Sequence, residues 1–256
     1  MKQGLGDSID KENRVTLSPK GRKGKPMSTA VLEKSQVSPA DSTSRNGASG
    51  RGNVPESARI PITRTMARLL ADNGLIEERY ELIDGEIISK MGAKPPHSFT
   101  IRLIFRWLLS LFGVDFVQSQ LPIDPDVPDA EIQDPVPDII ALNVSWETMP
   151  DRNPTSHEIA LAVEVASSSL ESDKTKKARL YARAGIVEYW IADTESRTLI
   201  VYRKPLNGTY QSVTTYTAEE TVSCLAAPDA SVLVDALIAP TPSNTCLLYT
   251  SPRPRD

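Results

Sequence analysis

The sequence predicts an α/β (α+β) protein in which short helices and buried strands alternate. In the segment 161–190 an apolar strand, a helix and a second apolar strand follow one another. The pair Asp84-Gly85 separates two short apolar runs, which is the pattern of a β-hairpin with a two-residue turn. Across 97–112 the apolar residues recur at helical spacing. We therefore expect one folded domain, over residues 58–238.

Local signals predict the elements in chain order. Helices are expected to end at Gly or Asn-Gly, and hairpins to turn at Asp-Gly or Asn-Gly pairs. The expected order is a helix at 60–72, a hairpin at 80–90, a helix at 97–112, strands at 114–123, 138–144 and 161–166, a helix carrying Asp173 and Lys177, a strand at 188–192, a C-terminal hairpin at 198–216 and a last strand or turn at 231–237. The Pro- and Asp-rich stretch 124–137 is expected to be a loop that serves a site.

Both ends of the chain are expected to lie outside the domain. Residues 1–57 are rich in Ser, Gly, Lys, Pro and Asn, so they cannot bury enough apolar surface to offset the entropy of ordering. We expect a disordered extension there, with Met27 as an alternative start and a nucleic-acid-binding arm as the competing interpretation. The last residues, TCLLYTSPRPRD, resemble translated adapter read-through, so 239–256 is expected to be non-native or disordered.

The charge is unevenly distributed. Residues 1–57 hold 10 Lys and Arg against 6 Asp and Glu. Because that segment contributes +4 to a total of −4, the rest of the chain carries −8. An acidic domain is not typical of proteins that bind DNA through a basic surface. It suits a carboxylate site that binds a cation before it accepts phosphate.

Composition and motifs exclude several classes of protein. No apolar run reaches the roughly 18 residues of a membrane helix, and the opening residues do not predict a secretory signal. Two cysteines provide no disulfide framework, so a cytoplasmic location is expected. Two histidines argue against a histidine-rich zinc site. The absence of GxGxxG, GxxxxGK[ST] and GxSxG patterns argues against dinucleotide binding, a P-loop and a nucleophile elbow.

Two acidic residues are candidate metal ligands. Asp138 follows Pro137 where an extended loop enters a buried strand. Glu164 lies inside an apolar strand, where a carboxylate is costly unless it is paired or bound to a metal. Carboxylates from adjacent strands could share one Mg²⁺, which needs oxygen ligands and keeps several waters. The alternatives are a capping role for Asp138 and a structural ion pair for Glu164.

Lys177 is the third candidate. It shares one helix face with Leu170 and Tyr181, so we expect that face to point at the sheet. An inward lysine could orient the attacking water or stabilise the charge that develops on phosphorus. Asp173, one turn earlier, could pair with it. The alternatives are a solvated Lys177 whose stem packs past Tyr181, and a capping or packing role for His97 at the start of its helix.

Taken together, these motifs resemble the Uma family of restriction-endonuclease-like proteins, within the PD-(D/E)xK nuclease superfamily. The resemblance covers roughly residues 60–238. The residues that carry it are YELIDGEI at 80–87, His97, Pro137-Asp138, Glu164-Val165, Ser167 to Ser169, Asp173, Lys177, LYARAG at 180–185 and EYWIAD at 188–193.

The resemblance implies a restriction-endonuclease-like mixed β-sheet flanked by helices. It also implies a Mg²⁺-dependent endonuclease, with Mn²⁺ as a substitute, that hydrolyses phosphodiester bonds of DNA. Asp138 and Glu164 match the two acids. The superfamily places a lysine two residues after the second acid, where this chain has Ala166, so the resemblance gives that role to Lys177.

The opening hairpin supplies two further acids. Glu81 and Glu86 both match acidic positions of the family's hairpin, and one of them is expected to complete the site. The competing hypothesis is an inactive nuclease-fold module that binds nucleic acid or protein, which Ala166 and the acidic domain favour. A third is an RNA-directed or exonucleolytic enzyme. The expected partner is DNA and not a membrane, and a homodimer would suit cleavage of both strands.

Overall fold

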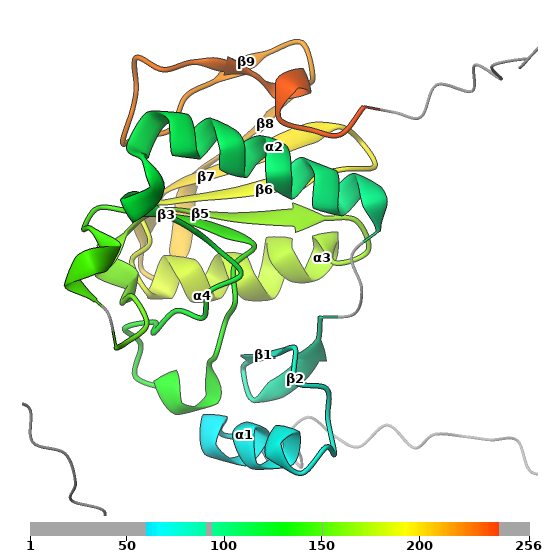
Figure 1. Cartoon of the computed structure of the whole chain (residues 1–256), viewed down its shortest axis with the longest axis vertical. Coiled ribbons are helices and arrows are strands. Elements are labelled where there is room, and N and C mark those ends of the chain that lie inside the picture. Colours follow the sequence, from blue (N-terminus) through cyan, green and yellow to red (C-terminus); the bar gives the residue numbers. More distant parts are fainter. Residues whose placement is uncertain (1–59, 91–93, 150, 241–256) are drawn as a thin grey trace, which may run out of the picture. The chain divides into compact units, whose positions relative to one another are not determined.

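The structure is a computed structural model that describes residues 60–90, 94–149 and 151–240 (Figure 1). The chain divides into two units, and all described residues belong to the second, Asn53–Asp256. The predicted extension at 1–57 lies outside the described residues, as do residues 241–256 of the predicted tail. No helix of the described part is long and apolar enough to cross a membrane.

A six-stranded mixed sheet forms the centre, in the order β3-β4-β5-β6-β7-β8. Strands β5 and β6 run parallel and the other neighbours run antiparallel. A parallel pair needs a crossover connection, which here is a helical segment. The strands are β3 Val117–Ser119, β4 Ile139–Leu142, β5 Ile159–Ala166, β6 Glu188–Asp193, β7 Thr198–Leu206 and β8 Thr209–Tyr216, and the crossover is α3 Leu170–Ser172, a π-helical turn Asp173–Lys177 and α4 Ala178–Arg183.

Helices cover both faces of this sheet (Figure 1). Helix α2 (Pro95–Phe112) lies on one face, with β9 (Thr221–Val222) and β10 (Val232–Leu233) beyond it, and α3 and α4 lie on the other. Alternate residues of β5 enter opposite cores, because Val163 packs in the α2 layer and Ala162 in the α4 layer. Glu164 has the same parity as Ala162, so its side chain faces the crossover helices.

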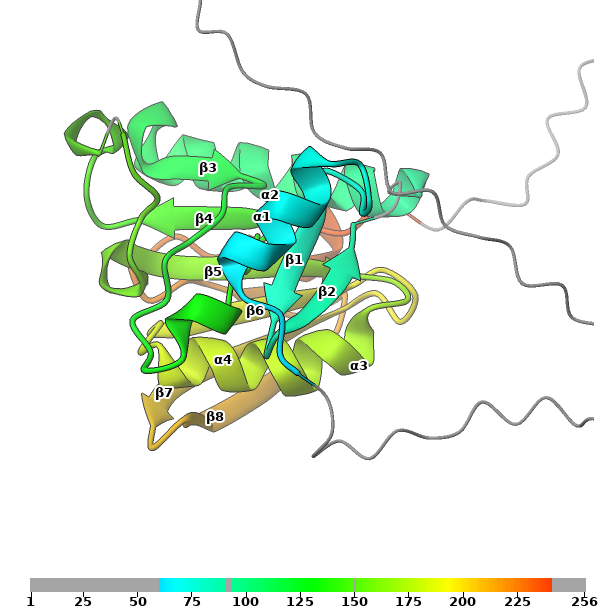
Figure 2. The same ribbon diagram turned by 90° about the horizontal axis from the view of Figure 1, so that it is seen from below.

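A helix and a hairpin precede α2 and lie on the α3–α4 side of the sheet (Figure 2). They are α1 (Arg64–Asp72), β1 (Tyr80–Ile83) and β2 (Glu86–Ser89). The turn needs φ of 51° at Asp84 and 73° at Gly85, as in a type I′ turn. A Cβ at residue 85 would lie 2.5 Å from Pro61 Cβ, so glycine is required there. Leu82 exchanges two backbone hydrogen bonds with Asp134, which ties the hairpin to the 124–137 loop.

The predicted fold class and hairpins are confirmed, and so are the helices, except that the first begins at Arg64 and not at residue 60. The predicted strand at 114–123 is wrong in extent. Residues Val114–Phe116 form a 3-10 turn, and β3 is limited to Val117–Ser119. Gln120, directly after the strand, has φ of 53°, and Pro122 has no N–H to donate, so the ladder does not continue past Ser119. The last predicted strand is β10 followed by a 3-10 turn at Val234–Ala236.

The core position of β5 predicts a large difference between two leucines. Leu161→Ala removes a fully buried side chain from the centre of the sheet and is expected to lower the free energy of unfolding by about 2–5 kcal/mol. Leu206→Ala at the end of β7, where the side chain is 57% exposed, is expected to change it by at most about 0.5 kcal/mol. Urea denaturation followed by tryptophan fluorescence measures both, and similar losses would contradict the assigned core.

Candidate functional site

The pairing of β4 with β5 brings Asp138 and Glu164 together. Ile139 pairs with Val163 in this antiparallel ladder, and the same register carried one residue further sets Asp138 opposite Glu164. Opposite residues of an antiparallel pair project from the same face. Asp138 Oδ2 also accepts a hydrogen bond of 2.9 Å from the backbone N–H of Val165. Both carboxylates are therefore buried and held against the same strand.

The crossover helix delivers Lys177 to these acids. Its Nζ lies 2.9 Å from Glu164 Oε1 and 2.8 Å from Glu81 Oε2, and its side chain is 5% exposed. Asp173 Oδ1 lies 3.7 Å from the same nitrogen. Asp173 and Lys177 begin and end the π-helical turn, a distortion often found at functional sites. The structure thus places Lys177 on the inward face, as the helical spacing predicts, and not in solvent.

Glu164 is held by two donors on one oxygen. Tyr181 donates its hydroxyl hydrogen to Oε1 at 2.9 Å, beside the Lys177 contact. The hydrogen bond and the ion pair recorded for Glu164 both involve Oε1. Burial raises the pKa of Glu164 to about 8, against the lowering effect of Lys177 and Lys90. The carboxyl group therefore takes up a proton near neutral pH when only lysines balance its charge.

For the pKa of Lys177 the neighbouring charges outweigh burial, whereas for the pKa of Glu164 burial outweighs the neighbouring charges. Burial lowers the pKa of Lys177, but Glu164 and Glu81 outweigh burial and hold this pKa above the usual range. The ammonium group therefore stays protonated at neutral pH. Lys177 can attract anions and donate hydrogen bonds there, and it cannot accept a proton from water.

Asp138 remains ionised in the same pocket. Burial acts to raise its pKa, but His97, Lys90 and the Val165 N–H outweigh burial and bring the pKa below the usual range. His97 Nε2 lies 3.5 Å from Asp138 Oδ2, and Lys90 Nζ lies 3.4 Å from Oδ1. His97 does not cap its helix, because α2 begins at Pro95 with Lys94 as the N-cap. The capping alternative for His97 is wrong, since its side chain points at the acid.

The hairpin contributes Glu81 and leaves Glu86 outside. Glu81 is buried, and its Oε1 accepts a 2.8 Å hydrogen bond from the backbone N–H of Val136. Glu86 projects from the same hairpin face but lies next to the turn, opposite Ile83. It is exposed and pairs with Lys176. Of the two acids expected to complete the site, the structure brings Glu81 to the other carboxylates.

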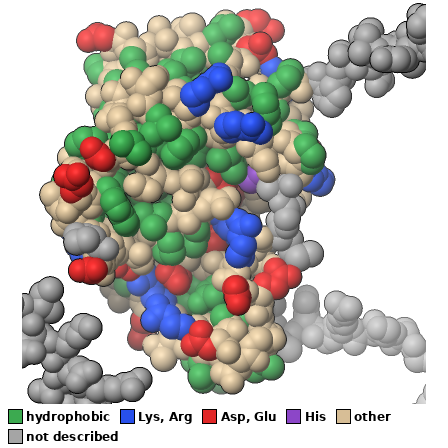
Figure 3. Space-filling model, viewed as in Figure 1, with side chains coloured by type: hydrophobic (Ala, Val, Ile, Leu, Met, Phe, Trp, Pro, Cys, Tyr) green, Lys and Arg blue, Asp and Glu red, His purple; other side chains and the backbone are tan. Residues whose placement is uncertain are grey.

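These side chains line a pocket of about 370 Å³. Hydroxyl groups of the serine turn, at Ser167 to Ser169, form part of its wall, and the exposed cations Arg79 and Lys94 stand at its rim. Figure 3 shows lysine, arginine and acidic side chains around the histidine visible on this face. A pocket with carboxylates inside and cations at its mouth is suited to a phosphate group bound together with a metal ion.

The residues present fit a hydrated divalent cation. Four buried acids meet only two lysines inside the pocket, since the third lining lysine, Lys94, is exposed at the rim, and Asp173 Oδ1 is buried without a hydrogen-bond partner. Mg²⁺ and Mn²⁺ prefer such carboxylate oxygens. Among the described residues no three acidic, His or Cys side chains are already gathered as a metal cage. One or two carboxylates with several waters suffice for Mg²⁺, and Asp138 with Glu164 are the pair that would hold it. The acids are Glu81, Asp138, Glu164 and Asp173, and the lysines are Lys90 and Lys177.

Sequence reasoning missed two participants. Tyr181 was expected only as an apolar member of the helix face, yet its hydroxyl contacts Glu164. Lys90 was not singled out at all. Strand alternation could have found it, because Lys90 lies two residues past Ile88, which pairs with Glu81 and shares its face.

Comparisons with known proteins point to one family. A family model described as "Uma2: Putative restriction endonuclease" matches residues 74–235. A solved structure described as "a putative nuclease belonging to DUF820" from Anabaena variabilis ATCC 29413 is 20% identical and covers 69% of this chain and 97% of that chain. Its TM-score is 0.50, and at this identity the likeness shows the fold alone. No curated protein matches this chain.

The pairing of Lys177 predicts a stability difference between adjacent lysines. In metal-free buffer at pH 8, Lys177→Met leaves Glu81 and Glu164 without their shared cation, and unfolding free energy is expected to fall by about 3–5 kcal/mol. Lys176→Met removes only an exposed pair with Glu86, for which a change below about 1 kcal/mol is expected. Urea denaturation checks both variants. Equal losses would show that Lys177 is not the buried cation of the site.

The raised pKa of Glu164 predicts a pH dependence of stability. Its pKa in the folded protein, about 8, lies above the ordinary value of 4.5, so the folded state holds the proton more tightly. This stabilisation is complete below about pH 4.5 and is lost as the pH rises through about 8.

Between these limits the free energy of unfolding of the metal-free protein should fall with pH, by at most about 1.4 kcal/mol per unit from this group. Glu164→Gln should flatten that decline, because the amide does not titrate. Denaturation in urea at several pH values between 5 and 8, with a chelator present, measures both slopes. Parallel slopes would assign the titration to other groups.

Proposed function

We propose that this chain is a metal-dependent endonuclease acting on DNA, and the proposal starts from its family: the chain belongs to the Uma2 family, whose model spans residues 74–235. The observation that carries the proposal is the convergence of Asp138, Glu164 and Lys177 in one pocket. Asp138 immediately precedes β4, Glu164 lies in β5 and Lys177 ends the π-helical turn of the crossover, and all three residues are buried.

Each residue has a distinct role in this proposal. Asp138 is ionised and its Oδ2 is held by the Val165 N–H, so Oδ1 is the oxygen that it would offer to a cation. Tyr181 orients Glu164 through a hydrogen bond to Oε1. Oε2 of Glu164 would then be the second oxygen that binds the cation, after the oxygen of Asp138. When bound, the divalent cation polarises a phosphoryl oxygen and lowers the pKa of a water molecule. Cation binding also favours the charged form of Glu164, so metal affinity should rise with pH.

Lys177 acts as a fixed positive charge. Because it stays protonated, it serves to orient the attacking water by donating a hydrogen bond, or to stabilise negative charge on the phosphorane-like transition state. The residue two positions after Glu164 is Ala166, which has no charge to contribute. The helix therefore supplies the cation that the nuclease pattern places on the strand.

DNA is proposed as the substrate because of the family and the layout of the pocket. The rim cations Arg79 and Lys94 would contact phosphates on either side of the scissile one. The hydroxyls of Ser167 and Ser168 offer neutral donors to the same phosphate backbone, whereas Ser169 donates to Asp173 Oδ2. The interior remains acidic, so a nucleic acid strand would approach productively only with a metal ion in place.

A second candidate is a nuclease-fold module that binds without cleaving. It is favoured by one observation, that the buried acids are already paired with lysines and form no metal cage among the described residues. Calorimetric titration with Mg²⁺ and Mn²⁺ separates the two candidates. Lack of binding at millimolar metal favours the module.

Cleavage of circular DNA tests the nuclease proposal. Wild-type protein with Mg²⁺ or Mn²⁺ is expected to nick a closed plasmid, which has no ends for an exonuclease. Asp138→Asn and Glu164→Gln are expected to reduce the rate by about a hundredfold or more, since each removes a metal ligand. Gel analysis of the plasmid, with single-stranded DNA and RNA run in parallel, measures rate and substrate preference.

The two hairpin acids provide a matched control. Glu81→Gln changes a buried acid that contacts Lys177, whereas Glu86→Gln changes an exposed one paired with Lys176. Only the first is expected to impair cleavage, and circular dichroism confirms that each variant folds. Full activity of folded Asp138→Asn and Glu164→Gln proteins would refute the proposed site.

A further inference from the structure

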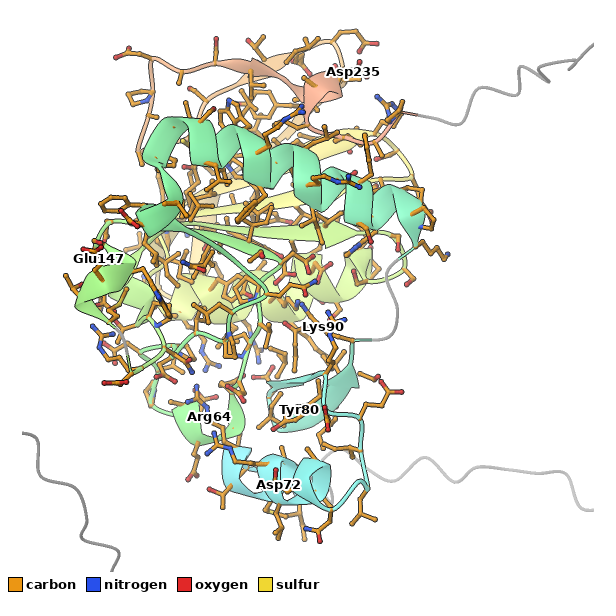
Figure 4. The ribbon with its side chains drawn as sticks, viewed as in Figure 1. Arg64, Asp72, Tyr80, Lys90, Glu147 and Asp235 are labelled. Atoms are coloured by element: carbon orange, nitrogen blue, oxygen red, sulfur yellow. The ribbon has the colours of Figure 1, made fainter. Side chains whose placement is uncertain are left out.

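A second lysine enters the acidic pocket from the hairpin and not from the crossover helix. Lys90 follows β2, and Figure 4 shows it where the hairpin meets the α3 side of the sheet. Its Nζ donates a 2.5 Å hydrogen bond to the backbone carbonyl of Val136. The same nitrogen lies 3.4 Å from Asp138 Oδ1 and 3.5 Å from Glu81 Oε1. Lys90 therefore lies between the strand acid and the hairpin acid.

The two lysines divide the carboxylates between them. Lys177 contacts Glu164 and Glu81, and Lys90 contacts Asp138 and Glu81. Glu81 is thus shared, and every acid of this trio has an ammonium group beside it. Carboxylates crowded in a low-dielectric pocket repel one another unless a cation lies among them. In the absence of a metal ion, the lysines supply that charge.

The two lysines are not held equally. Lys177 projects from the packed helix, is 5% exposed and approaches its acids to 2.8 and 2.9 Å. Lys90 is 18% exposed, and its carboxylate contacts are long, at 3.4 and 3.5 Å. Its one short bond goes to a neutral carbonyl. Lys90 is consequently the cation that can leave the pocket with the smaller loss of contacts.

We propose that the Lys90 ammonium is a built-in competitor of the metal ion, occupying the mouth of the Asp138–Glu81 pair and withdrawing when a divalent cation binds. This inference rests on the proposed nuclease function and adds a means of regulating it. Lys90 keeps the acids ordered and balanced in the metal-free protein. It also sets the metal concentration above which the site fills, because metal binding must overcome the ion pairs that Lys90 gives up.

Metal titration of two lysine variants tests the inference without relying on cleavage. Lys90→Met removes the competitor, and the dissociation constant for Mn²⁺ measured by calorimetry is expected to fall about tenfold. Lys94→Met removes the same charge from the pocket rim, where no ion pair to an acid forms among the described residues, and should change it by less than about twofold. Lys90→Arg preserves the charge and is expected to stay near the wild-type value.

The Mn²⁺ affinities of the wild type and the two lysine variants show whether Lys90 competes with the metal ion. Equal Mn²⁺ affinity of wild type and Lys90→Met, or weaker binding by the variant, overturns the role of Lys90 and leaves the nuclease proposal intact. Equal tightening by Lys90→Met and Lys94→Met also overturns it, because the effect is then general charge. If neither wild type nor Lys90→Met binds Mn²⁺ at millimolar concentration, this inference and the nuclease proposal both fail. Should Lys90→Met not fold by circular dichroism, Lys90→Gln, which keeps a donor for the Val136 carbonyl, replaces it.

Discussion

The site is organised by one constraint, the burial of the Glu164 carboxylate inside a central strand. A charged group there is tolerated only with compensation nearby, because water is excluded from it. The crossover helix meets that requirement with Lys177 at 2.9 Å and the Tyr181 hydroxyl at the same distance. Both residues lie on the helix face that packs on the sheet, so the contacts that neutralise Glu164 also fix the helix against β5. The acid is thus part of the packing between sheet and helix as well as part of the site.

The topology explains why the remaining groups arrive at the same place. Because β5 and β6 are parallel, the chain must cross over between them, and the crossover helices lie on the face that Glu164 occupies. The antiparallel pairing of β4 brings Asp138 to the same end of β5. The hairpin then closes the pocket from outside, anchored through the Leu82–Asp134 backbone bonds. Four segments that lie far apart in the sequence therefore each contribute at least one charged group to the pocket.

The sequence could predict those parts of the site that depend on local pattern. The apolar run around Glu164, the strand entry at Asp138 and the helix face of Lys177 are all visible within a few residues. The position at which the hairpin packs against the rest of the domain decides which of its two acids joins the site. This is a long-range contact, and the alternation of residues along a strand does not predict it. Lys90 was missed for the same reason, since its partners Asp138 and Val136 lie almost fifty residues away. The prediction of a strand over 114–123 was wrong for a different reason. The apolar pattern continues past Gln120, whose left-handed backbone conformation the pattern does not indicate.

Ala166 belongs to the packing that surrounds the inward-facing Lys177. This residue is fully buried, lies on the same face of β5 as Glu164 and packs in the cluster that contains Ala178 and Leu180 of the helix. Small side chains at 166 and 178 take up little room in this cluster between the strand and the helix. A longer side chain at 166 would have to be accommodated among close-packed neighbours, and overpacking of that kind is destabilising. The alanine at 166 is therefore compatible with the position of the crossover helix at which Lys177 approaches Glu164 to 2.9 Å.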